Sequence, residues 1–227
     1  LIMNFENAII MAAGRGLRMK PLTDKIPKAM APINSSTLIA NRIKKLKKYF
    51  KNVHITVGYK GSMLAKHVIE QDVSSVINTE GKGNAWWIFN TLLKNIDGPL
   101  FVFTCDNLVD LEYEKYIDNY LFYKSPACMV IPVKPVKGID GDYIFHDDNI
   151  VNSIKRNRIS EIYCSGVQII DIKKINLKVK PTENFSDIWN SLITLKELYV
   201  SKHIASNWYS IDDVHHLDKA NSIFDKN

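Results

Sequence analysis

The sequence has 227 residues, of which 46% are hydrophobic and 24% are charged, with a net charge of +6. These values are ordinary for a globular protein that is long enough to bury a sizeable core. No tract is long and apolar enough to span a membrane. The basic residues are spread along the chain. A mild excess of this kind suits anionic small molecules as well as nucleic acid.

The cysteines and the first residues of the sequence indicate the cellular compartment in which the protein is expected. Cys105, Cys128 and Cys164 are scattered, odd in number and form no CxxC motif. This pattern argues against a disulfide framework or a zinc site. The first residues lack the basic n-region and the cleavage site of a signal peptide. We therefore expect a cytoplasmic protein.

Strands and helices are predicted to alternate in the first part of the chain. Helical spacing predicts a helix that carries Ile39, Ile43 and Leu46, with Ser36 as its N-cap. Further helices are predicted at residues 62–71 and 84–93, and strands at residues 8–11, 53–57, 76–77, 100–104 and 127–133. Alternation of this kind implies a mostly parallel sheet covered on both faces.

The pattern changes after Pro135. Residues 138–151 contain Gly and Asp turn signals between apolar residues, which predicts a hairpin. A strand is expected at residues 166–170, an amphipathic helix at 187–199 and a last helix at about 214–224. We find no linker, repeat or low-complexity segment. The simplest prediction is an α/β fold: a single domain, residues 1–227, with a mixed, mostly parallel central sheet flanked by helices.

A glycine-rich loop follows the first predicted strand, in the stretch "IIMAAGRGLRMKPLTDKIPKAMAPI". Ligands of open α/β sheets bind at the carboxyl ends of strands. Gly14 and Gly16 let backbone N–H groups approach a phosphate closely. Arg15, Arg18 and Lys28 supply positive charge. A dinucleotide fingerprint is excluded because its third glycine is replaced by Met19, and a P-loop is excluded because Gly-Lys-Ser/Thr is absent.

An isolated GxG would usually be a surface turn with solvated cations, but the whole string needs an explanation. It matches G-x-G-x-R-[LM]-x-P-L-T-x-x-x-P-K-x-[LM]-x-P-[IV] at every fixed position. In this it resembles the bacterial nucleotidyltransferases that couple a nucleoside triphosphate to a sugar 1-phosphate or a similar phosphorylated acceptor, a group that includes the phosphocholine cytidylyltransferases. The resemblance covers most of the chain and weakens after about residue 135.

The resemblance implies a Rossmann-like domain of the GT-A type, a magnesium ion and release of pyrophosphate. It implies that residues 1–135 bind the nucleotide and residues 136–227 the acceptor. Arg18 would contact the triphosphate, and Lys28 would bridge the nucleotide and acceptor phosphates. The nucleotide would also contact the segment formed by Met11, Ala12, Ala13, Gly14, Arg15 and Gly16. Arg15 stands at a variable position of the motif.

Two carboxylates are candidate metal ligands. The strand "LFVFT" ends in Cys105-Asp106-Asn107, where the family usually has an L-G-D-N-like string. A carboxylate at a strand's carboxyl end beside a phosphate loop is placed to hold a metal ion. Asp106 is therefore the first predicted ligand, although it would alternatively cap the next turn. The resemblance implies acceptor contacts for Asn107.

The second carboxylate lies near the C-terminus, where many sugar 1-phosphate enzymes have W-x-D-[VI]-G-T. The matching stretch here is "NWYSIDDVHHL", in which Ser210 replaces the usual aspartate. This departure resembles the phosphocholine cytidylyltransferase branch, where an acidic residue two positions later can serve the metal. Residues two apart in an extended segment point the same way. Asp212 can therefore take the role of position 210, although Asp212 or Asp213 would alternatively cap the final helix.

Four further residues fall at positions that contact substrates in the family. Asn84 matches a position near the base, and Glu161, Gly166 and Asp187 match acceptor positions. Asp187 would alternatively be a helix cap, and Gly166 would alternatively be needed only for close packing. Trp86 and Trp87 are adjacent in a predicted helix and face different ways, so at least one belongs to the core. His215 and His216 lack metal-ligand spacing and are read as surface or capping residues.

The sequence therefore predicts a nucleotidyltransferase that joins a nucleoside triphosphate to a phosphorylated acceptor, with a sugar 1-phosphate favoured. A phosphocholine-type cytidylyltransferase and a catalytically silent nucleotide-binding subunit remain alternatives. No nucleic-acid or membrane partner is expected, because the lysine cluster at residues 44–48 is more simply the solvated side of a helix. The base, the acceptor and whether the chain forms a homo-oligomer stay open.

Overall fold

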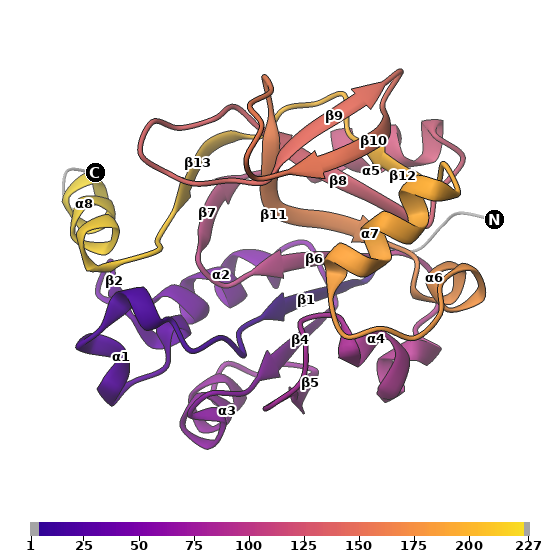
Figure 1. Cartoon of the computed structure of the whole chain (residues 1–227). Coiled ribbons are helices and arrows are strands. Elements are labelled where there is room, and N and C mark those ends of the chain that lie inside the picture. Colours follow the sequence, from indigo (N-terminus) through magenta and orange to yellow (C-terminus); the bar gives the residue numbers. More distant parts are fainter. Residues whose placement is uncertain (1–4, 225–227) are drawn as a thin grey trace. The chain divides into compact units, whose positions relative to one another are not determined.

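The computed structural model describes residues 5–224, and Figure 1 shows its helices and strands in sequence colours. The chain divides into two compact units whose segments alternate along the sequence. Unit 1 contains residues 83–102 and 109–208. Unit 2 contains residues 5–82, 103–108 and the C-terminal segment from residue 209. Strands β6 (Leu100–Thr104), β7 (Asn107–Asp110) and β13 (Ser206–Ser210) each have residues in both units.

Unit 2 is built on parallel strands. β4 (Asn52–Val57) pairs with β1 (Asn7–Met11) on one side and with β5 (Ser75–Asn78) on the other. Parallel neighbours need a crossover, and α2 (Leu38–Leu46) and α3 (Gly61–Ile69) lie in these connections. The remaining elements are η1 (Leu17–Met19), α1 (Leu22–Lys25), η2 (Lys28–Met30), β2 (Pro32–Ile33), β3 (Ser36–Thr37) and α8 (Val214–Phe224).

Unit 1 has a mixed sheet. Its strands follow the order β11 (Tyr163–Ile170), β8 (Cys128–Val133), β12 (Leu198–Val200), β10 (Ile150–Lys155) and β9 (Tyr143–Asp147). β12 and β8 are parallel, and the other neighbours in this series are antiparallel. Its helices are α4 (Trp86–Asn90), η3 (Leu92–Asn95), α5 (Tyr113–Phe122), α6 (Ile172–Lys178) and α7 (Phe185–Thr194).

The predicted α/β class with a mixed central sheet flanked by helices is confirmed, and so are the predicted strands, to within a few residues at their ends. The parallel pairs of unit 2 fall in the part of the chain where strands and helices alternate. The hairpin predicted at residues 138–151 is present as β9 and β10. No helix among residues 5–224 is long and apolar enough to cross a membrane.

Two local predictions are wrong. The helix predicted at residues 187–199 ends at Thr194, because Lys196 takes a left-handed conformation with φ 54° and the chain then enters β12 beside β8. The predicted cap of α2 is also displaced by one residue. Thr37, not Ser36, accepts a hydrogen bond from the Ala40 N–H at 3.1 Å, since Ser36 pairs with Ile33 in a short hairpin.

Candidate active site

The glycine loop runs from the end of β1 to η1, entirely within unit 2. The Ala12 N–H donates to the Thr56 carbonyl at 3.1 Å, which fixes the start of the loop on β4. The two glycines serve different purposes. A Cβ on Gly14 would meet nothing within 4 Å, so the backbone there is open to a ligand. Gly16 has φ 61°, and a Cβ on it would lie 2.8 Å from the Cβ of Lys28.

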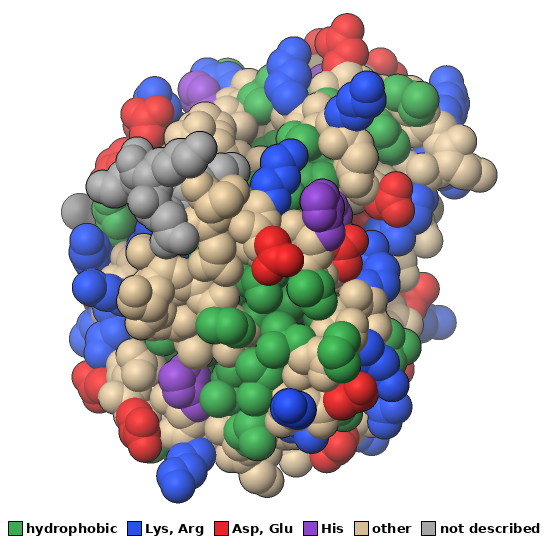
Figure 2. All heavy atoms as spheres, turned by 90° about the vertical axis from the view of Figure 1, so that its left-hand side faces the viewer, with side chains coloured by type: hydrophobic (Ala, Val, Ile, Leu, Met, Phe, Trp, Pro, Cys, Tyr) green, Lys and Arg blue, Asp and Glu red, His purple; other side chains and the backbone are tan. Residues whose placement is uncertain are grey.

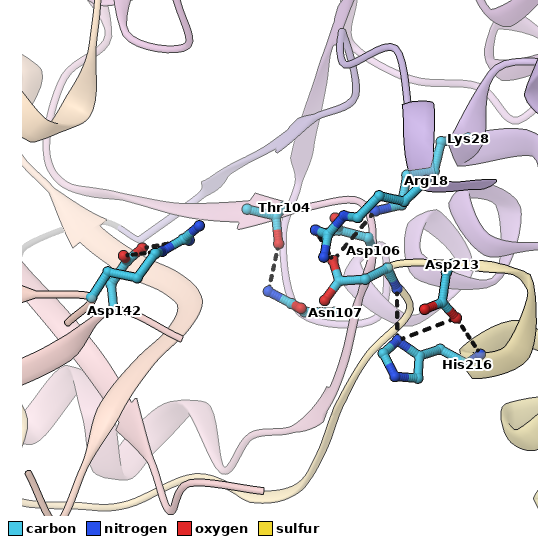
Figure 3. Close-up of polar contacts among 10 residues, drawn as sticks. Arg18, Lys28, Thr104, Asp106, Asn107, Asp142, Asp213 and His216 are labelled. Carbon is cyan, nitrogen blue, oxygen red and sulfur yellow. Dashed lines mark hydrogen bonds and ion pairs between the residues drawn. The ribbon is translucent and has the colours of Figure 1, made fainter. Parts of the chain in front are cut away.

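Lys28 is buried beneath this loop and contacts both predicted metal ligands (Figure 3). Its Nζ lies 2.6 Å from Oδ2 of Asp106 and 3.8 Å from Oδ1 of Asp212. The ammonium group therefore sits between two carboxylates that are far apart in the sequence. Because a buried charge is stable only when it is paired, these two carboxylates explain how Lys28 is accommodated.

A backbone hydrogen bond brings the two carboxylates together. The Ile211 N–H donates to the Asp106 carbonyl at 2.9 Å, which lays the chain before α8 alongside the turn that follows β6. Asp212 then also accepts a hydrogen bond from Nη2 of Arg18 at 3.0 Å. The Arg18 side chain is 64% exposed whereas that of Asp212 is 11% exposed. Arg18 is therefore free to reorient at the surface, and Lys28 is fixed at the base of the site.

The structure gives different roles to Asp212 and Asp213, either of which the sequence allowed as the cap of the final helix. Asp213 caps α8, because its carboxylate accepts a hydrogen bond from the His216 N–H at 2.8 Å. The Asp212 side chain faces Arg18 and Lys28 instead. Nδ1 of His216 accepts a hydrogen bond from the Asp212 N–H at 3.3 Å, so the first turn of α8 holds the backbone of Asp212. His216 thus has a capping role, as expected, and a contact with the site that its spacing did not indicate.

Cys105, which stands where the family usually has glycine, is not a nucleophile. Burial, followed by the neighbouring carboxylate of Asp106, raises the pKa of its thiol to about 12. The thiol is therefore neutral near pH 7 and carries no reactive thiolate. Its backbone N–H donates to the Met11 carbonyl at 3.2 Å, which joins the strand before Asp106 to the strand before the glycine loop.

The donor set suits a hard divalent cation that is completed by substrate. Asp106 and Asp212 offer carboxylate oxygens on either side of one ammonium group. Residues 5–224 contain no group of three or more His, Cys, Asp or Glu side chains that could hold a metal ion. Magnesium is usually bound through one or two carboxylates together with water and substrate phosphates. The two aspartates therefore fit magnesium in a complex with a nucleotide better than they fit a self-sufficient metal site.

Asn84, predicted to lie near the base, belongs to unit 1 and ties two of its segments together. Its Oδ1 accepts a hydrogen bond from the Phe185 N–H at 2.9 Å. Gly83 makes this contact possible, since a Cβ there would lie 2.1 Å from the Glu183 carbonyl oxygen. Trp87, three residues after Asn84, is buried and donates from its indole N–H to the Asn84 carbonyl at 2.9 Å, which confirms that one of the two tryptophans belongs to the core.

The predicted acceptor residues are distributed over both units. Asn107, in unit 2, donates from its side-chain amide to Thr104 at 2.7 Å. Within unit 1, Glu161 lines a hollow of about 530 Å³ between the β9–β10 hairpin and residues 201–204. Gly166 and Asp187 do not line it. Gly166 has φ 81° at an irregularity of β11, and the Asp187 carboxylate accepts a hydrogen bond from Thr182.

Comparison with known proteins identifies the family. The family model described as nucleotidyl transferase matches residues 7–139. The bifunctional protein GlmU of Methanococcus aeolicus is 26% identical over 196 residues, which cover 82% of this chain and 38% of that protein. The mannose-1-phosphate guanyltransferase of Debaryomyces hansenii is 25% identical over 213 residues, which cover 84% of this chain and 57% of that protein. The chain thus spans about half the length of these relatives, or less.

Solved structures share the fold. The inositol-1-phosphate CTP transferase from T. maritima aligns with a TM-score of 0.77 at 18% identity and covers 99% of this chain and 97% of its own. The CTP:phosphocholine cytidylyltransferase from Streptococcus pneumoniae aligns with a TM-score of 0.73 at 22% identity, over 96% of this chain and 98% of its own. Since the family model covers more than half of the sequence, the chain belongs to the nucleotidyl transferase family.

Proposed function

We propose that this protein transfers a nucleotidyl group from a nucleoside triphosphate to a phosphorylated small molecule, with release of pyrophosphate. The single observation that carries the proposal is the convergence of Asp106 and Asp212 on Lys28 beneath an open glycine loop. Family membership supports the same reaction type. The favoured acceptor is a sugar 1-phosphate, in keeping with the mannose-1-phosphate guanyltransferase relative.

In the proposed reaction, an acceptor phosphate oxygen attacks the α-phosphorus and the bond to the β-phosphate oxygen breaks. The attacking oxygen is already anionic, so no general base is needed. The protein's task is to position two phosphates and to neutralise their charge. Lys28 acts at the α-phosphate, where charge develops. Arg18, whose side chain is mostly exposed, turns to the leaving pyrophosphate.

Asp106 and Asp212 would hold magnesium, which when bound offsets the repulsion between the nucleotide and acceptor phosphates. The backbone of Asp212 is held by His216 and by the neighbouring Ile211–Asp106 bond, so the carboxylate keeps its place when Arg18 leaves it. Preorganisation of this kind is what gives charged groups a large effect on rate. The nucleotide would lie against the loop from Met11 to Gly16.

A non-sugar acceptor is the alternative, and a specific observation favours it. Ser210 stands where sugar 1-phosphate enzymes usually carry the aspartate, and Asp212 two positions later makes the contacts with Arg18 and Lys28. The phosphocholine cytidylyltransferase and the inositol-1-phosphate CTP transferase are among the proteins with this fold. A phosphorylated alcohol of that kind is therefore the second candidate acceptor.

The proposed partners are small molecules. On the face shown in Figure 2, Lys and Arg side chains lie among acidic ones. A cytoplasmic location is part of the proposal, because the reaction consumes nucleoside triphosphates. Self-association into a homo-oligomer is open to sedimentation measurements.

The decisive experiment measures pyrophosphate release with magnesium, crossing ATP, CTP, GTP and UTP with several sugar 1-phosphates, phosphocholine and other phosphorylated alcohols. We expect turnover with one pair, and the identity of the acceptor separates the sugar proposal from its alternative. Nucleotide binding without turnover across the whole panel would instead support the catalytically silent subunit.

The same assay tests the residues. Lys28→Ala and Asp106→Asn should each lower the rate by about 10² to 10³ at saturating magnesium, the scale of one lost contact in a preorganised site. Lys25→Ala is the matched control, because this exposed lysine lies three residues earlier and carries the same charge. Near-normal turnover in either site variant would contradict the assignment.

A further inference from the structure

A second loop of unit 2, Gly58-Tyr59-Lys60, is built against the glycine loop. It connects β4 to α3. The Tyr59 N–H donates to the Ala13 carbonyl at 3.0 Å. A Cβ on Gly58 would lie 2.8 Å from that same carbonyl oxygen, so only glycine allows the two loops to approach this closely. The contact is made within the stretch proposed to bind the nucleotide.

The Tyr59 side chain fixes the far end of the glycine loop as well. Its hydroxyl donates to the Thr23 carbonyl at 2.8 Å. Thr23 is buried, and its own hydroxyl donates to the Gly16 carbonyl at 2.9 Å. Tyr59 therefore braces the glycine loop at Ala13 directly and at Gly16 through Thr23. A backbone that must present N–H groups to a phosphate gains from this, because the loop does not have to be ordered when the ligand binds.

Two cations lie against the ring of Tyr59. The guanidinium carbon of Arg15 is 5.6 Å from the ring centroid, and Nζ of Lys60 is 5.5 Å from it. Both distances are within the range of a cation–π interaction. Among residues 5–224, neither cation has a carboxylate partner within 4.0 Å. Two like charges are thus held on one ring beside a loop with an open backbone, an arrangement that suits an anionic ligand.

We propose that Arg15 and Lys60, both held on Tyr59, form a subsite for the outer phosphates of the nucleoside triphosphate and for the pyrophosphate released from it. This rests on the proposed function and adds Lys60 and Tyr59 to its site. Lys60 binds phosphate directly, and Tyr59 is a positioning residue. Lys28 then serves the α-phosphate, and the Arg15–Lys60 pair joins Arg18 in binding the outer phosphates.

The test measures binding of inorganic pyrophosphate, and separately of the four nucleoside triphosphates and their monophosphates, by calorimetry in the presence of magnesium. Lys60→Gln should weaken pyrophosphate and triphosphate binding about tenfold, the scale of one charged hydrogen bond, and leave monophosphate binding unchanged. Lys66→Gln is the matched control, since this exposed lysine of α3 has the same charge and lies six residues later. It should bind all these ligands as the parent does.

Tyr59 is tested by two variants. Tyr59→Phe keeps the ring and loses only the hydrogen bond to the Thr23 carbonyl, so it should lose less pyrophosphate affinity than Tyr59→Leu, which also removes the ring and should lose at least as much as Lys60→Gln. Equal affinity of the parent and Lys60→Gln for pyrophosphate, with turnover intact in both, would overturn this subsite and leave the proposed function standing. Failure of the parent to bind pyrophosphate or any triphosphate would overturn both. Weaker binding of monophosphate and pyrophosphate alike would show a general structural defect and would also refute the subsite.

Discussion

Replacement of Asp212 by asparagine should lower the reaction rate, whereas the same replacement of the adjacent Asp213 should leave the rate unchanged. Asp212→Asn keeps the shape of the side chain and removes the charge that faces Arg18 at 3.0 Å and Lys28 at 3.8 Å. We expect a loss of about 10² to 10³ in the rate of pyrophosphate release, because one charged group of a preorganised site is gone. The magnesium concentration needed for half-maximal rate should rise as well.

The stability of the Asp212→Asn variant should change little. Lys28 keeps Asp106 at 2.6 Å, so its buried charge stays paired. Arg18 is 64% exposed and water replaces its partner, which limits the change in unfolding free energy to about 1 kcal/mol or less. An activity loss of the expected size is therefore separable from unfolding by measuring the melting temperature of the same sample.

Asp213 is the matched comparison. Asparagine caps a helix about as well as aspartate, so Asp213→Asn should keep both the rate and the melting temperature. Asp213→Ala should cost about 1 kcal/mol of stability, since the His216 N–H at the start of α8 loses its acceptor. A rate for Asp212→Asn close to that of the parent, or an equal loss of rate in Asp213→Asn, would refute the reasoning that assigns Asp212 to the site.

Three further predictions concern the scaffold and are checked by thermal or urea unfolding. Gly16→Ala should destabilise the protein by about 1 to 3 kcal/mol, because φ is 61° and the new Cβ would meet Lys28, while Gly14→Ala, which meets nothing within 4 Å, should leave the unfolding free energy nearly unchanged. Thr37→Ala should cost about 1 kcal/mol through loss of the α2 cap, and Ser36→Ala should stay within about 0.5 kcal/mol of the parent. Burial lowers the pKa of His54 below its ordinary value of 6.5, so on acidification the unfolded chain binds a proton before the folded protein does. The free energy of unfolding should therefore fall as the pH drops below 6.5. His54→Gln should show a shallower fall, and an unchanged pH dependence in that variant would contradict the assignment.

Local signals were sufficient for the parallel part of the fold and for the glycine loop. β1, β4 and β6 are short, buried and mostly apolar, so their identity as strands follows from the sequence alone. The structure explains both glycines of the loop motif, since Gly16 takes a left-handed backbone conformation and the backbone at Gly14 is open. The conformations of these residues depend on immediate neighbours, which is why a reading of the sequence reaches them.

Helices whose apolar pattern is weak or misleading could not be predicted from the sequence in the same way. α5 was missed because its apolar stripe consists mainly of tyrosines, with the large Phe122 exposed at its end. α6 has only seven residues, too few to show a period. The end of α7 was misplaced because Leu195 and Tyr199 continue the helical spacing, whereas pairing of β12 with β8 takes the chain out of the helix.

The pairing of Lys28 with both carboxylates also lies beyond sequence reasoning, because it depends on one long-range backbone bond between Ile211 and Asp106. The sequence pointed to Asp212 as the metal ligand but left either Asp212 or Asp213 as the cap of the final helix. Which of the two faces the site is set by where α8 begins, and that is fixed by the Asp213–His216 hydrogen bond. A difference of one position in the sequence thus separates Asp213, which caps the helix, from Asp212, which faces the site.

The charges of the site argue for the form in which its substrate binds. Arg18 and Lys28 formally balance Asp106 and Asp212, so the four side chains are neutral as a group without any ligand. A bare divalent cation added to this group would face the Lys28 ammonium that already lies between the two carboxylates, and the site would gain two positive charges. The proposed nucleoside triphosphate would bring the missing negative charge, and its phosphates would give Arg18 a new partner as it leaves Asp212. If the proposed function holds, electrostatics therefore favours the entry of magnesium together with the nucleotide, as one complex, over the filling of the two aspartates by the metal alone.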